Sequence, residues 1–335
     1  MRRRFLFWVG TLAADVGAAS LTSILAAAQD ALPGAKATVV KKAAAALKTP
    51  WGDPDLQGVW NGSGATPMER PAAFAGRETL TDDEIARLNG EDEAGADRPP
   101  RAGDPGAYND FWFGRGKRTR QTSMVVGPPN GRFPPLTPAG QAASKGLRRG
   151  ADAPGDRHLW ERCITRGGMP NAMFPRAYNN NAHILQIPGY VAILMEQIHE
   201  TRLIPLDGRP HVSQSVRQWM GDSRGHWEGE TLVVDTTNIS ERVSGLQPWA
   251  EFNSHSGSGE RLHVVERFKR VDPNTIEYTI TVDDPQMYTR PWTVRYPMTK
   301  STELMYEYAC HEGNYGMAGI LAAGRAEAAK PNVTK

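Results

Sequence analysis

The stretch Thr275-Ile276-Glu277-Tyr278-Thr279-Ile280-Thr281-Val282 decides the fold class of this chain. Its apolar side chains fall on every second residue, and the residues between them are polar. A period of two is that of a half-buried β-strand, because successive side chains of a strand point to opposite faces of the sheet. The stretch therefore predicts one strand of an antiparallel sheet with a buried face and a solvated face.

Similar segments lie on both sides of this strand, separated by turn sequences such as Pro188-Gly189 and Asp272-Pro273-Asn274. The expected strands are residues 183–187, 190–198, 230–238, 261–271, 275–282, 290–296 and 303–309. A strongly curved meander has to pair with a second sheet or close on itself, and closure removes its exposed edges. We expect a mainly β fold in which a curved antiparallel meander closes into a barrel, with short helices and a long Pro-rich insertion. A β-sandwich is the alternative.

Two short helices are expected before the meander. Thr81 and Glu84 match the Ser/Thr-x-x-Glu capping pattern that begins a helix, and Gly90 would end it. Pro138 suits the first position of a second helix, which would run to about residue 148. Residues 55–61 favour a first strand, so this region is expected to supply one strand and the cover of the barrel.

The first residues resemble an export signal. Met1-Arg2-Arg3-Arg4-Phe5-Leu6 places paired arginines just before Phe and Leu, the address read by twin-arginine export. Apolar or small residues follow, except for Asp15, and end on Ala26-Ala27-Ala28, a small-residue cleavage pattern. A membrane anchor is the alternative, but Asp15 would cost it roughly 2.5 to 3.5 kcal/mol. We expect a periplasmic or secreted protein with no stable membrane span once the leader is removed.

The chain is accordingly divided into three parts: a twin-arginine-type signal peptide (1–28), a flexible linker (29–49) and a single mainly-β domain (50–330). Within the domain, residues 50–160 hold the first strand with its covering loops and helices, and residues 183–310 form the meander. The net charge is only +2, so nucleic acid is not expected as a partner. The oligomeric state does not follow from the sequence.

Cys163 and Cys310 are the two cysteines of the chain. In an oxidising compartment an even number of cysteines favours a disulfide bond, and two buried thiols are the alternative.

Two resemblances to known families rest on short motifs. Leu56-Gln57-Gly58-Val59-Trp60 fits the Gly-x-Trp pattern that opens lipocalin-like (calycin) barrels, although a longer insertion precedes the meander here. The segments Trp227-Glu228-Gly229-Glu230-Thr231-Leu232-Val233-Val234 and Tyr308-Ala309-Cys310-His311-Glu312-Gly313-Asn314-Tyr315 resemble a widespread family of exported bacterial proteins. These resemblances imply export and a calycin-like barrel, and they transfer no catalytic residues.

Titratable residues gather where an apolar strand is expected to end. Glu196 and His199 follow a run of apolar side chains. A carboxylate held against apolar walls has a raised pKa, which suits general acid or base catalysis near neutral pH. We expect these two residues to be the proton-transfer pair, with His311 as a third member and Arg209, or a tyrosine hydroxyl, stabilising developing negative charge. The alternative is a solvated strand end at which Glu196 pairs with Arg202.

A second motif, Gly221-Asp222-Ser223-Arg224-Gly225, matches the Gly-x-Ser-x-Gly nucleophile pattern of α/β-hydrolases. That pattern requires a strand before the serine and a helix after it, whereas a turn and a strand are expected after this serine. Residues 222–225 are therefore expected to form a hairpin turn. Asp207-Gly208-Arg209-Pro210-His211 places an acid, a cation and an imidazole in another tight loop.

A barrel of this size can hold one small, largely apolar molecule. The aromatic residues expected to line it are Tyr278, Trp292, Tyr296, Tyr306 and Tyr308. The sequence contains neither a nucleotide-binding glycine loop nor a metal-binding histidine spacing, so no cofactor and no metal are expected, with zinc held by distant ligands as the alternative. We expect an exported, cofactor-independent acid/base enzyme, a lyase, isomerase or hydrolase. The alternatives are a periplasmic carrier of an apolar ligand and a cell-wall or glycan-associated structural module.

Overall fold

The computed structural model describes residues 47–96, 116–145, 151, 153–175, 178–243 and 261–330. They belong to one of the two units into which the chain divides, Ala44–Lys335. The expected signal peptide and all but the last residues of the expected linker lie outside the described residues.

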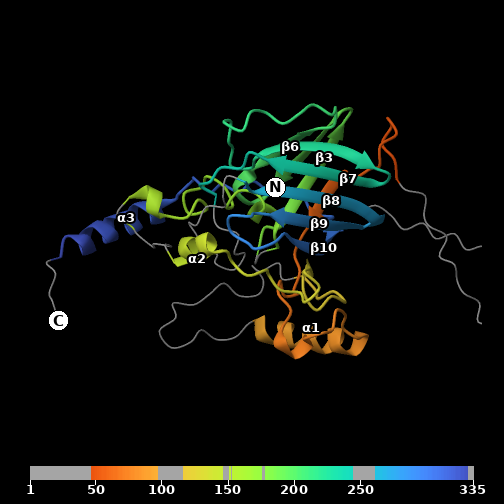
Figure 1. The fold of residues 1–335 in the computed structure, drawn as a ribbon, viewed down its shortest axis with the longest axis horizontal. Helices are drawn as coiled ribbons and strands as arrows, with labels where there is room; N and C mark the ends of the chain where they lie inside the picture. The colour runs from red at the N-terminus through yellow and green to blue at the C-terminus, as the bar shows by residue number, and fades with distance from the viewer. Residues whose placement is uncertain are drawn as a thin grey trace, which may run out of the picture. The chain divides into compact units, whose positions relative to one another are not determined.

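Ten antiparallel strands of the described part form one sheet that curves into a nearly closed barrel, accompanied by three α-helices (Figure 1). The strands are β1 (Gly58–Asn61), β2 (Val125–Gly127), β3 (Asn181–Ile187), β4 (Tyr190–Met195), β5 (Thr201–Pro205), β6 (Asp222–Glu228), β7 (Thr231–Thr237), β8 (His263–Asp272), β9 (Thr275–Asp283) and β10 (Trp292–Lys300). The helices are α1 (Asp82–Ala96), α2 (Pro138–Lys145) and α3 (Tyr315–Ala328). The expected fold class, mainly β with a meander closing into a barrel, is confirmed.

The strand order is β5-β4-β3-β1-β10-β9-β8-β7-β6, and β2 pairs with β10 outside this path. Figure 1 shows β6 to β10 side by side, as consecutive hairpins require. The first strand departs from the simple order, because β1 lies between β3 and β10 and pairs with both. One strand from the start of the domain therefore joins the two arms of the meander.

Side chains along β9 point alternately into the core of the barrel and toward its outer face. Ile276, Tyr278, Ile280 and Val282 are fully buried, and the residues between them are partly exposed. The ring of Tyr278 packs against Phe268 of β8 at 4.7 Å and against Tyr296 of β10 at 5.1 Å between centroids. Burying each such side chain contributes roughly 1.5 to 3 kcal/mol. These inward side chains fill the space between the strands.

The barrel has a seam, defined here as the junction of β5 with β6, the two ends of the strand order. The two strands are in contact, but the ladders of the described strands do not include a β5–β6 pair. Gly225 of β6 permits this approach, since a Cβ there would lie 2.6 Å from Leu206 Cδ2 and 2.9 Å from Ile204 Cγ2. A glycine inside a strand often marks such close packing.

Three expectations about individual strands are wrong. Residues 222–225 form part of β6, because Gly225 serves close packing instead of a turn. The strand expected at 190–198 ends at Met195, where the chain enters a short 3₁₀ turn, Gln197–His199. Residues 303–309 do not form a strand, because β9 and β1 already occupy the sides of β10 to which they could have paired.

The helix starts agree with the capping patterns. Thr81 Oγ1 accepts a hydrogen bond from the Glu84 N–H at 3.2 Å, and Glu84 Oε2 accepts one from the Thr81 N–H at 2.8 Å. Helix α1 continues past Gly90, and α2 begins at Pro138 as predicted. Among the described residues, none of the helices has the length and apolar character that crossing a membrane requires.

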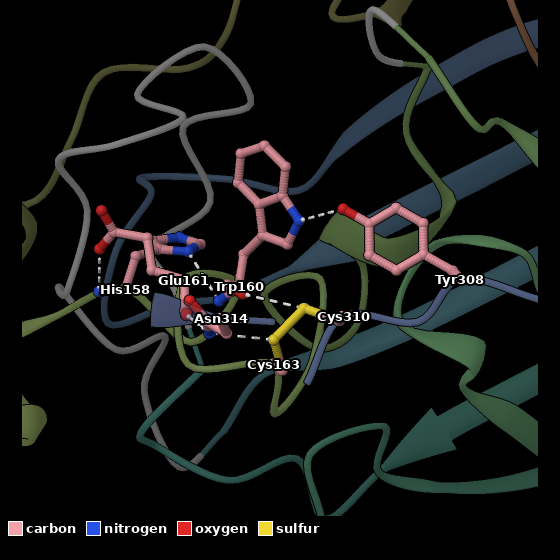
Figure 2. The surroundings of a disulfide bond; sticks show 7 residues. All are labelled: His158, Trp160, Glu161, Cys163, Tyr308, Cys310 and Asn314. Atoms are coloured by element: carbon pink, nitrogen blue, oxygen red, sulfur yellow. Dashed lines mark hydrogen bonds between the residues drawn. A yellow bond between two sulfur atoms is a disulfide. The ribbon is translucent and has the colours of Figure 1, made fainter. Parts of the chain in front are cut away.

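A disulfide bond joins Cys163 to Cys310, 147 residues further along the chain, which confirms the predicted pairing (Figure 2). Around it, Trp160 Nε1 donates to the Tyr308 hydroxyl at 3.4 Å, and Asn314 Nδ2 donates to the Glu161 carbonyl at 3.1 Å. The bond therefore fixes the segment before α3 to the turn around Cys163.

Candidate functional site

The structure does not assemble the expected catalytic pair, Glu196 and His199, as a hydrogen-bonded unit within the described residues. Glu196 is buried and its Oε2 accepts a hydrogen bond from Asn181 Nδ2 at 2.9 Å. His199 is exposed and lies in the turn after β4, not on the strand. The alternative pairing of Glu196 with Arg202 is also not what forms, since Arg202 pairs with Glu266.

The other two expected catalytic residues lie on the surface. Arg209 is paired with Asp207, two residues before it, and donates to the Tyr190 hydroxyl at 3.1 Å. His311 is exposed in the turn directly after Cys310. The disulfide at Cys310 supports this turn, but His311 is exposed and does not face the barrel interior.

The five aromatic residues expected to line one cavity occupy different environments. Tyr278, Trp292 and Tyr296 are buried and pack within the core. Tyr306 is 75 % exposed, and Tyr308 lies beside Trp160 at the disulfide. A barrel is compatible with a binding cavity, yet the inward aromatic rings of this one pack on each other.

A buried ion pair crosses the seam inside the barrel. Arg202 of β5 donates to both carboxylate oxygens of Glu266 of β8, and the two side chains are 1 % and 0 % exposed. Arg202 also donates to Ser223 Oγ of β6 at 3.2 Å and to Thr236 Oγ1 of β7 at 3.4 Å. Tyr278 donates its hydroxyl to Glu266 at 2.8 Å. Buried charges persist only when paired and hydrogen-bonded in this way.

This network changes how the groups titrate. Burial alone would lower the pKa of Arg202, but the charge and hydrogen bonds of Glu266, together with the nearby Tyr278 and Glu200, outweigh burial and raise it. Burial, assisted by the charge of Glu266, raises the pKa of Tyr278 well above its ordinary value. Arg202 therefore stays charged and Tyr278 stays neutral, and neither is available for proton transfer near neutral pH.

A second cluster lies on the outer face of the same strands and consists of Asp222, His211, Asp235 and His263. We call it the Asp–His cluster. His211 Nδ1 is 2.9 Å from Asp222 Oδ2, and its Nε2 is 2.9 Å from Asp235 Oδ1. Asp235 Oδ2 is 2.7 Å from His263 Nε2. One continuous chain of hydrogen bonds thus links two carboxylates and two imidazoles.

Strand alternation places three members of this cluster on one face. The outward positions of β6, β7 and β8 hold Asp222, Asp235 and His263, respectively. The next residue of each strand, Ser223, Thr236 or Val264, faces inward. His211 comes from the loop between β5 and β6 and reaches over these strands. The Val212 N–H also donates to Asp222 Oδ2 at 3.0 Å, which fixes this loop.

The two carboxylates shape the electrostatics of the cluster. Burial alone would raise the pKa of Asp235, but the hydrogen bonds and charge interactions with His263 and His211 together outweigh burial and lower it. The hydrogen bond to Asp235 raises the pKa of His263, and burial opposes this effect. Arg224 Nη1 donates to Asp222 Oδ1 at 2.6 Å and balances the charge of that carboxylate. His263 therefore holds a proton more firmly than a free imidazole does, while it remains partly exposed.

An open pocket of about 590 Å³ adjoins the Asp–His cluster. His211 and His263 line it together with Arg217 and Arg261, and no acidic side chain is among its described lining residues. Arg217 Nη1 donates to the Ile239 carbonyl at 3.1 Å, which holds this guanidinium beside the pocket. The pocket is thus cationic, and it favours a ligand with negative charge.

Such an arrangement provides groups for proton transfer. A carboxylate that holds one nitrogen of an imidazole orients the ring and raises its basicity, and the ring exchanges a proton with a bound molecule. Guanidinium groups nearby stabilise negative charge that develops on that molecule. Within the described residues, no group of three or more His, Cys, Asp or Glu side chains is arranged to hold a metal ion.

Sequence reasoning noted His211 and Asp222 but assigned them to separate turns, and it missed Asp235 and His263. The residues that pair across β6, β7 and β8 depend on strand register, and a loop of unknown path carries His211. The buried pair of Arg202 with Glu266 was easier to predict from the sequence, because Glu266 interrupts an inward apolar row between Val264 and Phe268. A charge at an inward position of an alternating strand is a signal for a buried partner.

Comparison of the chain with protein-family models, curated proteins and solved structures gives no match. The structure itself defines the class: a mainly β protein with a side-chain-filled, nearly closed antiparallel barrel and a disulfide.

Proposed function

We propose that this protein is an acid/base enzyme that transfers a proton on a small anionic molecule bound at the Asp–His cluster. The main support is a continuous chain of hydrogen bonds that runs from Asp222 through His211 and Asp235 to His263 beside a cationic pocket. His263 is the proton-transfer residue, because Asp235 holds only its Nε2 and the side chain is partly exposed. His211 is a positioning residue, since both of its ring nitrogens face carboxylates.

The proposed reaction classes are those expected from the sequence, but the proposed site lies outside the barrel instead of in its interior. Reactions of lyases, isomerases and hydrolases can each proceed by general acid/base catalysis with protein side chains, and we propose no cofactor here. The site lies on the outer face of β6 to β8, because core side chains occupy the interior where an apolar molecule was expected. Arg217 and Arg261 are the groups that would hold the anionic part of the substrate.

We also propose that the protein acts in the periplasm or outside the cell. The twin-arginine-like start supports this, and the disulfide is compatible with it, since such bonds persist in oxidising compartments.

The test is hydrogen exchange at carbon. The mature protein is incubated in D₂O with a panel of hydroxy acids, keto acids and uronic acids, and mass spectrometry follows deuterium incorporation and new products. We expect His263→Gln to slow the reaction of any responding compound by about 10²- to 10⁴-fold, the usual contribution of general acid/base catalysis.

The matched control is His226→Gln. His226 lies on an outward position of β6, like the cluster residues, but it is exposed and interacts with Glu228. It should leave the rate unchanged. Equal rates for wild type and His263→Gln would refute the proposal, and so would a wild type that gives neither deuterium incorporation nor a new product with any compound of the panel.

A further inference from the structure

Arg70 is a buried cation without an acidic partner. It is 6 % exposed, and within the described residues no carboxylate lies at ion-pair distance from its guanidinium. Its Nε donates to Thr122 Oγ1 at 3.0 Å and its Nη1 donates to the Pro129 carbonyl at 2.9 Å, so both acceptors are neutral. Burial of a charge is costly unless an opposite charge offsets it. Arg70 therefore attracts an anion that the described part of the chain does not supply.

The third nitrogen of this guanidinium remains available. Among the described residues Nη2 of Arg70 has no acceptor, and solvent reaches it. Arg70 lines an open pocket of about 370 Å³, a volume within the range of small-molecule sites. A molecule bound in this pocket can accept the hydrogen bonds that Nη2 does not make to the protein.

The loop of residues 128–132 holds Arg70 in place. The Arg70 N–H donates to the Gly131 carbonyl at 2.8 Å. Gly131 has φ of 70°, and a Cβ there would lie 2.9 Å from Arg70 Cβ, so glycine lets the loop lie against the arginine. Thr122 Oγ1, the acceptor of Nε, is itself fixed because it donates to the Arg77 carbonyl at 2.6 Å. The guanidinium is thus ordered before a ligand binds, which lowers the entropic cost of binding.

The pocket wall carries a second cation and one acid. Arg132 and Glu78 are exposed there, and within the described residues neither side chain makes an ion pair. Two guanidinium groups and one carboxylate give the pocket a net charge of +1. This charge suits one negative group, while Glu78 repels a second. The other described lining residues, which leave room for a compact apolar group, are Pro71, Ala72, Ala75, Gly76, Pro129 and Asn130.

We propose that this pocket is a binding site for a small monocarboxylate that carries a compact apolar group. The carboxylate would accept a hydrogen bond from Arg70 Nη2 and lie near the charge of Arg132. Hydrogen bonds between ionised groups are roughly twice as strong as neutral ones. The pocket shares no described lining residue with the pocket at the Asp–His cluster, and the proposal does not depend on the function proposed there.

The probe is butanoate, titrated into the ¹⁵N-labelled mature protein. We expect the backbone amide NMR signals of Ala72, Ala75, Gly76 and Asn130 to shift and to reach saturation. Butanamide has the same carbon chain without the charge, and succinate adds a second carboxylate. Each should bind more weakly by about tenfold, which corresponds to about 1.4 kcal/mol.

Ala75→Leu tests the place of binding without altering a charge. The added side chain would occupy the pocket, so the saturable shifts should disappear. Ala73→Leu is the matched control, because Ala73 is exposed in the 3₁₀ turn Ala72–Phe74 and is not among the described residues that line the pocket. It should bind butanoate as the wild type does.

The charges are tested at the exposed positions, since replacement of Arg70 would also loosen the loop. Arg132→Gln should weaken the binding of butanoate and leave that of butanamide unchanged. Glu78→Gln should strengthen the binding of succinate. Absence of saturable shifts with butanoate, equal affinity for butanamide, or wild-type binding by Ala75→Leu would overturn the proposal.

Discussion

At the residue scale, Asp235 is the centre of the Asp–His cluster, because its two carboxylate oxygens face two different imidazoles. The pair with His263 links stability to pH. The pKa of His263 is raised in the folded protein, so its pairing with Asp235 stabilises the fold. This stabilisation is fully present below the pKa of the unfolded state, about 6.5, and is lost as pH rises through the pKa of the folded state. The pKa of Asp235 is lowered, so the stabilisation that this carboxylate contributes is present above the pKa of the unfolded state, about 3.9. It is lost as pH falls through the lower pKa of the folded state.

We therefore expect the contribution of this pair to be largest between about pH 4 and pH 6.5. Melting temperatures of wild type and His263→Gln should lie furthest apart in that window and converge as pH rises toward 9. His226→Gln serves again as the control and should follow the wild-type profile. A constant difference between wild type and His263→Gln across the whole range would contradict this account.

Residues differ in how far sequence predicts their role. The capping pair Thr81 and Glu84 was predictable because all its partners lie within one helical turn. The contact between His263 and Asp235 was not, since it joins different strands whose register local sequence does not encode.

At the scale of elements, the seam between β5 and β6 depends on side chains. No ladder of the described strands joins the two, and the ion pair of Arg202 with Glu266 spans the junction together with Ser223 and Thr236. The pair accordingly ties β5 to β6, β7 and β8 at once.

Removal of one partner should be far more damaging than removal of both. Arg202→Met leaves Glu266 charged and unpaired in the core, which should lower the free energy of unfolding by about 3 to 5 kcal/mol in urea titrations. The double variant Arg202→Met with Glu266→Met should recover part of this loss. Arg267→Met is the control, because Arg267 makes an exposed pair on the outward face of β8 and should matter little. A double variant less stable than Arg202→Met would show that the charges themselves hold the seam.

Strands with clear alternation, such as β8 and β9, were predicted almost to their ends because burial on one face imposes a period of two. β6 was missed because Gly225 was interpreted as a turn residue, while its role is close packing against Ile204 and Leu206. The strand expected at 303–309 failed for a tertiary reason, since β10 offered no free side.

At the scale of the molecule, the disulfide closes a loop of 147 residues that contains β3 to β10. On the chain-entropy account, a loop of this length stabilises the fold by roughly 3 to 5 kcal/mol. Cys163→Ala with Cys310→Ala should therefore unfold at a lower urea concentration than wild type. A reductant should lower the midpoint of wild type to that of the variant and leave the variant unchanged. A reductant effect on the variant would point to another cause.

The position of β1 has a consequence for the route by which the chain folds. Trp60 of β1 pairs with Ala182 of β3 on one side and with Lys300 of β10 on the other. Strand β1 therefore cannot complete its pairing until β10 has been made. Contacts between such distant residues give a high contact order, and chains of high contact order fold slowly. The sheet therefore cannot be completed strand by strand in the order of synthesis: β1 gains its second neighbour only after the chain has been made as far as β10.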